Sequence, residues 1–213
     1  MAAELALRAG AAGCALIYLF LTAQPPGLLR SAMKTASVAL LALAALLAGA
    51  PLLLAAALGL CALGDLFLSR DGEGAFMAGT GAFAAGHLAY AALFLTRDAS
   101  EPARLLQMPG MAAAAGLLLL GLVMARILAP RAGALKGAVL AYIPVILGMG
   151  AAALTLPFGS WVFAAACAFM LSDMVLAVET FVLPRDHPLR RLTPYAVWPL
   201  YWGAQAGFLA AFS

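Results

Sequence analysis

The sequence predicts an all-α integral membrane protein, a bundle of about eight transmembrane helices, from three observations. Of its 213 residues, 66% are hydrophobic and only 10% are charged, and the mean hydropathy is +1.04. A soluble domain keeps about a quarter of its residues charged, so this chain has too few charges to cover a surface that faces water. The apolar residues also gather in eight runs, each close to the ~20 residues that a helix needs to cross a bilayer.

The eight runs are separated by segments rich in proline, glycine or charged residues. In chain order these separators are 24–27, Pro51, 70–74, 97–107, Pro130-Arg131, Pro157 and 184–190. The first run follows Glu4 rather than a basic cluster, so we expect a helix there and not a signal peptide. The connections are too short for another domain, and we expect one transmembrane domain, 1–213. The predicted spans are 5–22, 32–47, 52–69, 75–96, 109–129, 135–156, 160–183 and 193–212.

Basic residues lie mainly on one side of the predicted bundle. The connections that lead from an odd-numbered to an even-numbered span, with their flanks, hold nine of the twelve lysines and arginines. Cytoplasmic loops are enriched in basic residues. We therefore expect these connections in the cytoplasm and both termini outside it, in a multi-pass protein of a bacterial inner membrane. The nine are Arg30, Lys34, Arg70, Arg126, Arg131, Lys136, Arg185, Arg190 and Arg191, and the other three are Arg8, Arg97 and Arg104.

Several function classes find no support in composition or motifs. The net charge is +3, but the basic residues are scattered over short loops, which argues against nucleic-acid binding. The three cysteines, Cys14, Cys61 and Cys167, lie inside apolar runs without metal or redox spacing. Neither a Gly-x-Ser-x-Gly elbow nor a phosphate-cradling glycine loop is present, and only one histidine lies within a span. We therefore expect no metal and no cofactor.

Two segments four spans apart are similar to each other. The third span contains Gly64-Asp65-x-x-Leu68, and the seventh contains Ser172-Asp173-x-x-Leu176. A shift by four spans preserves orientation, so the pattern predicts a 4+4 parallel repeat with its pseudo-two-fold axis along the membrane normal. Such an axis would place Asp65 and Asp173 at a similar depth, facing each other. Chance similarity between alanine- and leucine-rich segments is the alternative explanation.

Four ionisable side chains lie inside predicted spans: Asp65, His87, Asp173 and Glu179. Such groups are costly in a bilayer and usually face the bundle interior or a wet cavity. Asp173 lies near the middle of its span, Asp65 is about 6 Å from the end of its span at 1.5 Å per residue, and Glu179 is expected at the solvated interface. His87 shares a helix face with Tyr90, either as a catalytic group or as a buried hydrogen-bonding group.

Paired carboxyl groups suggest a reaction class. When two of them share a site, one can stay protonated as an acid while the other is ionised and acts as a base. This is the requirement for acid–base hydrolysis without a metal or a covalent nucleophile.

The succession of these residues resembles the YhhN family of membrane proteins, which includes the lysoplasmalogenases. The resemblance rests on Gly64-Asp65-x-x-Leu68, Phe83-x-x-x-His87-x-x-Tyr90, Phe169-x-x-Ser172-Asp173-x-x-Leu176-Ala177, Tyr201-x-x-x-Gln205, Lys34 and Tyr142, in order over most of the chain. It implies hydrolysis of the vinyl ether bond of lysoplasmalogens, which gives a fatty aldehyde and a glycerophospho-ethanolamine or -choline. It also implies that Asp65 and Asp173 are the catalytic acid and base.

The other matched residues are expected to bind substrate: Lys34, His87, Tyr90, Tyr142, Ser172, Tyr201 and Gln205. Lys34 either pairs with the lipid phosphate or only anchors its helix at the cytoplasmic face. The expected partners are a lysophospholipid substrate and the lipid bilayer. Buried carboxylates in a parallel repeat also fit a small proton-coupled transporter, and a structural partner subunit is a third hypothesis.

Overall fold

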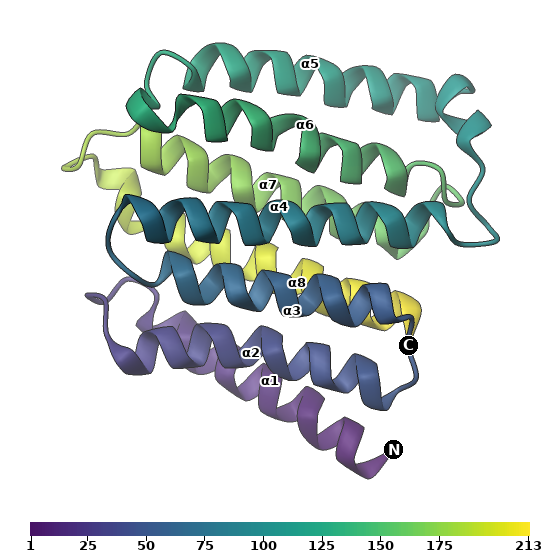
Figure 1. Cartoon of the computed structure of the whole chain (residues 1–213), viewed down its shortest axis with the longest axis horizontal. Helices are drawn as coiled ribbons and strands as arrows, with labels where there is room; N and C mark the ends of the chain where they lie inside the picture. Colours follow the sequence, from purple (N-terminus) through teal and green to yellow (C-terminus); the bar gives the residue numbers. More distant parts are fainter.

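The structure, a computed structural model, describes all residues, Met1–Ser213, and contains eight α-helices and no strand (Figure 1). The helices are α1 (Ala2–Leu21), α2 (Leu28–Leu47), α3 (Leu52–Leu68), α4 (Glu73–Leu95), α5 (Gly110–Leu128), α6 (Lys136–Ala153), α7 (Trp161–Phe181) and α8 (Thr193–Phe212). Short 3-10 helices lie in three connections: η1 (Pro102–Leu106), η2 (Gly133–Leu135) and η3 (Pro188–Arg191). Each predicted span coincides with one helix, and the all-helical prediction is confirmed.

Six helices are long and apolar enough to cross a membrane: α1, α2, α4, α5, α6 together with η2, and α7. The apolar helix α3 is shorter, with 17 residues, and α8 has 20 residues. Alanine and leucine, which dominate these segments, are strong helix formers. In a bilayer a helix also satisfies every backbone donor and acceptor within its own segment. The chain is therefore an integral membrane protein.

The helices alternate in direction and lie side by side, with both termini at the same end of the bundle (Figure 1). Helix α3 packs against α2 and α4, α7 packs against α8, and α4 packs against α6. Aromatic side chains fill the space where α4, α7 and α8 meet. Phe83 lies edge-on to Phe169, with ring centroids 6.4 Å apart, and Tyr90 packs against Phe208 at 4.4 Å.

The spacing of the helices supports the predicted repeat. Helix α1 begins at Ala2 and α5 begins at Gly110, 108 residues later. Helix α2 begins at Leu28 and α6 at Lys136, again 108 residues later. A shift by four helices also exchanges the contact between α4 and α6 with the contact between α8 and α2, and both contacts exist. The two halves of the bundle thus have corresponding helices and corresponding contacts.

Glycines let α3 and α4 approach closely. A Cβ atom on Gly86 would lie 2.8 Å from Cys61 Sγ and 3.3 Å from the Ala57 carbonyl oxygen, and one on Gly79 would lie 3.2 Å from the Gly64 carbonyl oxygen. Small residues at helix contacts are the usual basis of close packing in membranes. This contact fixes Asp65 on α3 relative to His87 on α4.

Candidate active site

One cavity of about 320 Å³ lies between the helices at one end of the bundle. Its lining comes mainly from the C-terminal halves of α1, α3, α5 and α7 and the N-terminal halves of α2, α4, α6 and α8. This is the end that carries the connections with nine of the twelve basic residues. Asp65 and Asp173 both line the cavity, so the structure brings the two predicted carboxyl groups to a common space.

Asp65 is fully buried, and both of its carboxylate oxygens have neighbours that match a negative charge. The Tyr201 hydroxyl donates a hydrogen bond of 2.7 Å to Asp65 Oδ2. Lys34 Nζ lies 3.0 Å from Asp65 Oδ1, although the pair lacks the alignment of a hydrogen bond. The contact is therefore a charge pairing, and a charge that is paired in this way can be buried at an acceptable cost.

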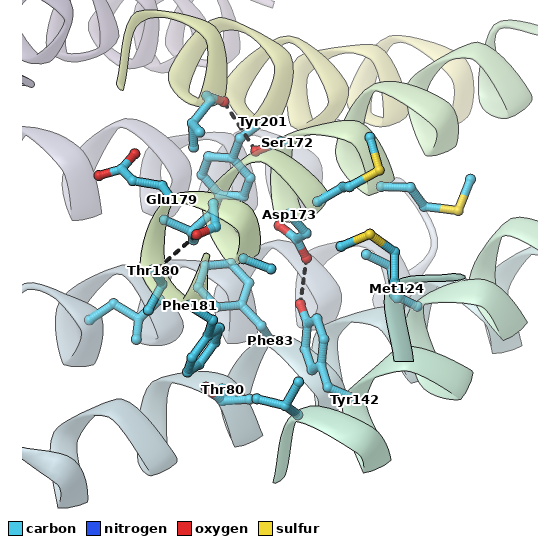
Figure 2. Close-up of a pocket in the computed structure, with 18 of the residues that line it drawn as sticks. Thr80, Phe83, Met124, Tyr142, Ser172, Asp173, Glu179, Thr180, Phe181 and Tyr201 are labelled. Carbon is cyan, nitrogen blue, oxygen red and sulfur yellow. Dashed lines mark hydrogen bonds between the residues drawn. The ribbon is translucent and has the colours of Figure 1, made fainter. Parts of the chain in front are cut away.

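Asp173 is held differently, as Figure 2 shows. The Tyr142 hydroxyl donates a hydrogen bond of 2.6 Å to Asp173 Oδ2, and His87 Nε2 lies 3.3 Å from the same oxygen. His87 Nε2 is also 2.8 Å from the Tyr142 hydroxyl, while Nδ1 faces Met149 Sδ at 3.2 Å. The Asp173 side chain is 17% exposed, and its Oδ1 makes no hydrogen bond within the protein. One carboxyl oxygen is thus positioned and the other is free to meet a ligand.

The two aspartates occupy corresponding places in the repeat. Asp65 and Asp173 are 108 residues apart, and so are Lys34 and Tyr142, their neighbours on α2 and α6. Each aspartate lies on the third helix of its own half, next to a residue on the second helix of that half. Each is also contacted from the fourth helix of the opposite half, Asp65 by Tyr201 and Asp173 by His87. The site is therefore built from two similar half-sites with different chemistry.

The predicted substrate-binding residues fall into two groups. Lys34, Tyr142, Ser172 and Tyr201 line the cavity. His87, Tyr90 and Gln205 are fully buried behind this wall and do not line it.

The residues of both groups also tie the helices together. Tyr90 donates a hydrogen bond to Gln205 Oε1, which joins α4 to α8. Ser172 Oγ donates to the Val197 carbonyl oxygen at 3.1 Å, which joins α7 to α8. His87 reaches the site through Asp173 and Tyr142 rather than directly.

The relative burial of the two carboxyl groups differs from what helix position suggested. Asp65 lies near the end of α3 but is fully buried, whereas Asp173, further from the end of α7, is partly exposed. The cause is the neighbouring helices: Lys34 and Tyr201 cover Asp65, while Asp173 borders open space. Glu179 also borders the cavity, 3.9 Å from Arg190 Nη1.

Sequence reasoning missed two parts of the cavity wall. The first is a polar corner formed by Tyr18, Thr22 and Arg30. The second is an apolar side between α5, α6 and α7, lined by Leu120, Met124, Leu128, Val139, Ile143 and Met174, among others. Neither part carries a motif, since apolar and singly polar residues in a span look the same whether they face lipid or a cavity.

The described chain contains no group of three or more His, Cys, Asp or Glu side chains that could hold a metal ion. In the comparisons with known proteins, a model of the YhhN family matches residues 29–212, which include α3, α7 and both aspartates. No curated protein and no solved structure matches the chain.

Proposed function

Since the chain belongs to the YhhN family, we propose that it is a membrane-embedded hydrolase that cleaves the vinyl ether bond of lysoplasmalogens. The products are a fatty aldehyde and a glycerophospho-ethanolamine or -choline. The observation that carries the proposal is the cavity shared by Asp65 and Asp173, which places two carboxyl groups beside a space large enough for part of a lipid.

The different surroundings of the two aspartates divide their roles. Lys34 compensates the charge of Asp65, and both oxygens of that carboxylate are occupied. Asp173 has no lysine or arginine within 4.0 Å and keeps one oxygen free at the cavity. We assign Asp173 as the proton donor, because a catalytic acid must reach the reacting carbon. Asp65 is assigned as the fixed negative charge.

The reaction then proceeds in two steps. The Asp173 carboxylic acid protonates the outer carbon of the alkene, whose π electrons form the new C–H bond, and an oxocarbenium ion results. The Asp65 carboxylate stabilises this cation electrostatically. Water adds to the carbon bonded to oxygen, and the ionised Asp173 takes the proton that the water loses. The hemiacetal collapses to the aldehyde and the glycerol alcohol.

The remaining wall of the cavity suits an amphiphilic substrate. The apolar side between α5, α6 and α7 is lined by flexible side chains such as Met124 and Met174. Methionine adapts well to ligands of irregular shape, and we place the alkenyl chain there. The basic residues around this end of the bundle put it on the cytoplasmic side of a bacterial inner membrane.

Incubation of the purified protein with a lysoplasmalogen tests the proposal. We expect stoichiometric release of a fatty aldehyde, and no hydrolysis of the acyl lysophospholipid with the same head group, because ester cleavage needs a nucleophile and an oxyanion hole. Absence of aldehyde together with proton-coupled uptake of a solute would support a transporter instead. Efficient hydrolysis of the ester would overturn the proposed chemistry.

A further inference from the structure

The corner of the cavity between α1 and α2 holds three hydrogen-bond donors without a partner. Tyr18 and Thr22 are 5% and 3% exposed, and Arg30 on the first turn of α2 is half-buried. All three line the cavity, and none of their side chains makes a hydrogen bond within the protein. Buried polar groups nearly always have partners, so three unpartnered donors on one wall indicate a ligand that accepts hydrogen bonds.

The charge of this corner is also uncompensated. Lys34 lies four residues after Arg30 on the same face of α2, but its charge is matched by Asp65 at 3.0 Å. Arg30 has no carboxylate within 4.0 Å; its Nε is buried without a partner, and its guanidinium lies 6.0 Å from the centroid of the Tyr18 ring. The contrast with Arg190 is clear, since that arginine has Glu179 and the Leu183 carbonyl oxygen as partners.

The N-terminus of α2 adds to the positive potential. Arg30 lies in its first turn, which contains no acidic residue and has no side-chain cap. The N-terminal end of a helix carries a partial positive charge, so a cation there is unfavourable unless an anion is near. The cavity corner therefore combines a free cation, two free hydroxyl groups and a positive helix end.

We propose that Tyr18, Thr22 and Arg30 bind the phosphodiester group of the lysophospholipid. This inference rests on the proposed function and extends it to head-group recognition. Arginine and hydroxyl donors suit phosphate oxygens. Arg30 is one helical turn from Lys34, about 6 Å along the axis, and Lys34 contacts Asp65. A glycerol backbone of three carbons, which separates the phosphate from the vinyl ether oxygen, spans a similar length, so an anchored phosphate places the reactive bond beside the aspartates.

Binding of ligands that cannot be cleaved tests the anion site separately from catalysis. The probes are a saturated 1-alkyl lysophospholipid and the matching 1-alkylglycerol, which lacks the phosphate, each measured with the full-length protein in the same detergent. We expect the wild type to bind the lysophospholipid at least tenfold more tightly, and Arg30→Gln to lose that preference while binding 1-alkylglycerol unchanged. Thr22→Val should lose part of the preference. Arg70→Gln removes an exposed cation outside the cavity wall and should change neither affinity.

The outcomes separate this inference from the proposed function. Equal loss of both affinities in Arg30→Gln, or an unchanged preference, would overturn the phosphate site. Binding of inorganic phosphate alone, tighter than that of the lysophospholipid, would keep an anion site but overturn the lipid phosphodiester as its ligand. If the wild type shows the Arg30-dependent preference but releases no aldehyde from lysoplasmalogen, the cleavage reaction is wrong and the site stands.

Discussion

At the scale of single residues, the same side chain serves two purposes because its neighbours differ. Asp65 and Asp173 belong to matching motifs. A lysine stands beside the first, and a tyrosine stands at the corresponding position beside the second. A fixed cation compensates the charge of a buried carboxylate, whereas a neutral hydroxyl donor positions the carboxyl group without adding charge. The proposed division into a fixed charge and a proton donor follows from this one difference.

Both carboxyl groups are expected to be essential. Asp65→Asn and Asp173→Asn should each lower aldehyde release at least a hundredfold, the usual scale for the loss of a positioned acid or base. The double variant should be little worse than either single one, because groups that act as a unit are not additive. Initial rates of aldehyde release by purified variants, with helical content as the control for folding, check this. Full activity in both single variants would refute the assignment.

Removal of Lys34 should destabilise the protein through Asp65. Lys34→Met leaves a fully buried carboxylate without its cation, and breaking such a pair typically costs about 3–5 kcal/mol. The free energy of unfolding of the purified variant measures the loss, with the exposed Lys136→Met as the matched control. Adding Asp65→Asn to Lys34→Met should restore most of the stability but no activity. A single Lys34→Met variant as stable as the wild type would show that the charge pair contributes nothing.

At the scale of elements, the contact between α3 and α4 determines where the catalytic groups meet. Gly86 lies one residue before His87 and touches α3 at Cys61 and Ala57. Any side chain at this position must push the helices apart, and His87 would move with α4. The element scale thus links a packing feature far from the substrate to the position of Asp173.

Gly86→Ala should therefore lower both stability and activity. The added methyl group would lie 2.8 Å from Cys61 Sγ, and overpacking of this kind costs about 1–3 kcal/mol. Gly81 on the same helix has open space around its Cβ position, so Gly81→Ala should leave activity unchanged. Thermal unfolding and aldehyde release measured on the two variants make the comparison. Similar behaviour of both would contradict the close packing of α3 and α4.

At the scale of the whole molecule, the repeat explains how one chain builds a two-sided site. Two four-helix halves each contribute an aspartate, and each half completes the other through its fourth helix. The cavity opens where the basic connections lie, and charge places this end in the cytoplasm. A cytoplasmic leaflet lipid could then enter from the side of the bundle near α5.

The orientation follows from the distribution of basic residues and is tested by labelling. Cysteines introduced at the exposed positions Asp98 and Asp186 lie in connections at opposite ends of the bundle. In intact cells a membrane-impermeant maleimide should modify Asp98→Cys and leave Asp186→Cys unmodified until the cells are opened. The wild type, with its three native cysteines, controls for background labelling. The reverse pattern would place the cavity outside the cytoplasm.

The sequence alone determined the fold class, the eight helices and the two aspartates. These features depend on local composition, since a run of about 20 apolar residues has few alternatives to a transmembrane helix, and a carboxyl group within such a run stands out. Only the tertiary structure decided which aspartate is enclosed, that Lys34 faces Asp65, and that Tyr18, Thr22 and Arg30 form one wall. Helix period and depth specify where a residue lies on its own helix. Its partners depend on which helices pack together, and contacts between residues far apart in the chain, such as Tyr201 with Asp65, leave no local pattern in the sequence.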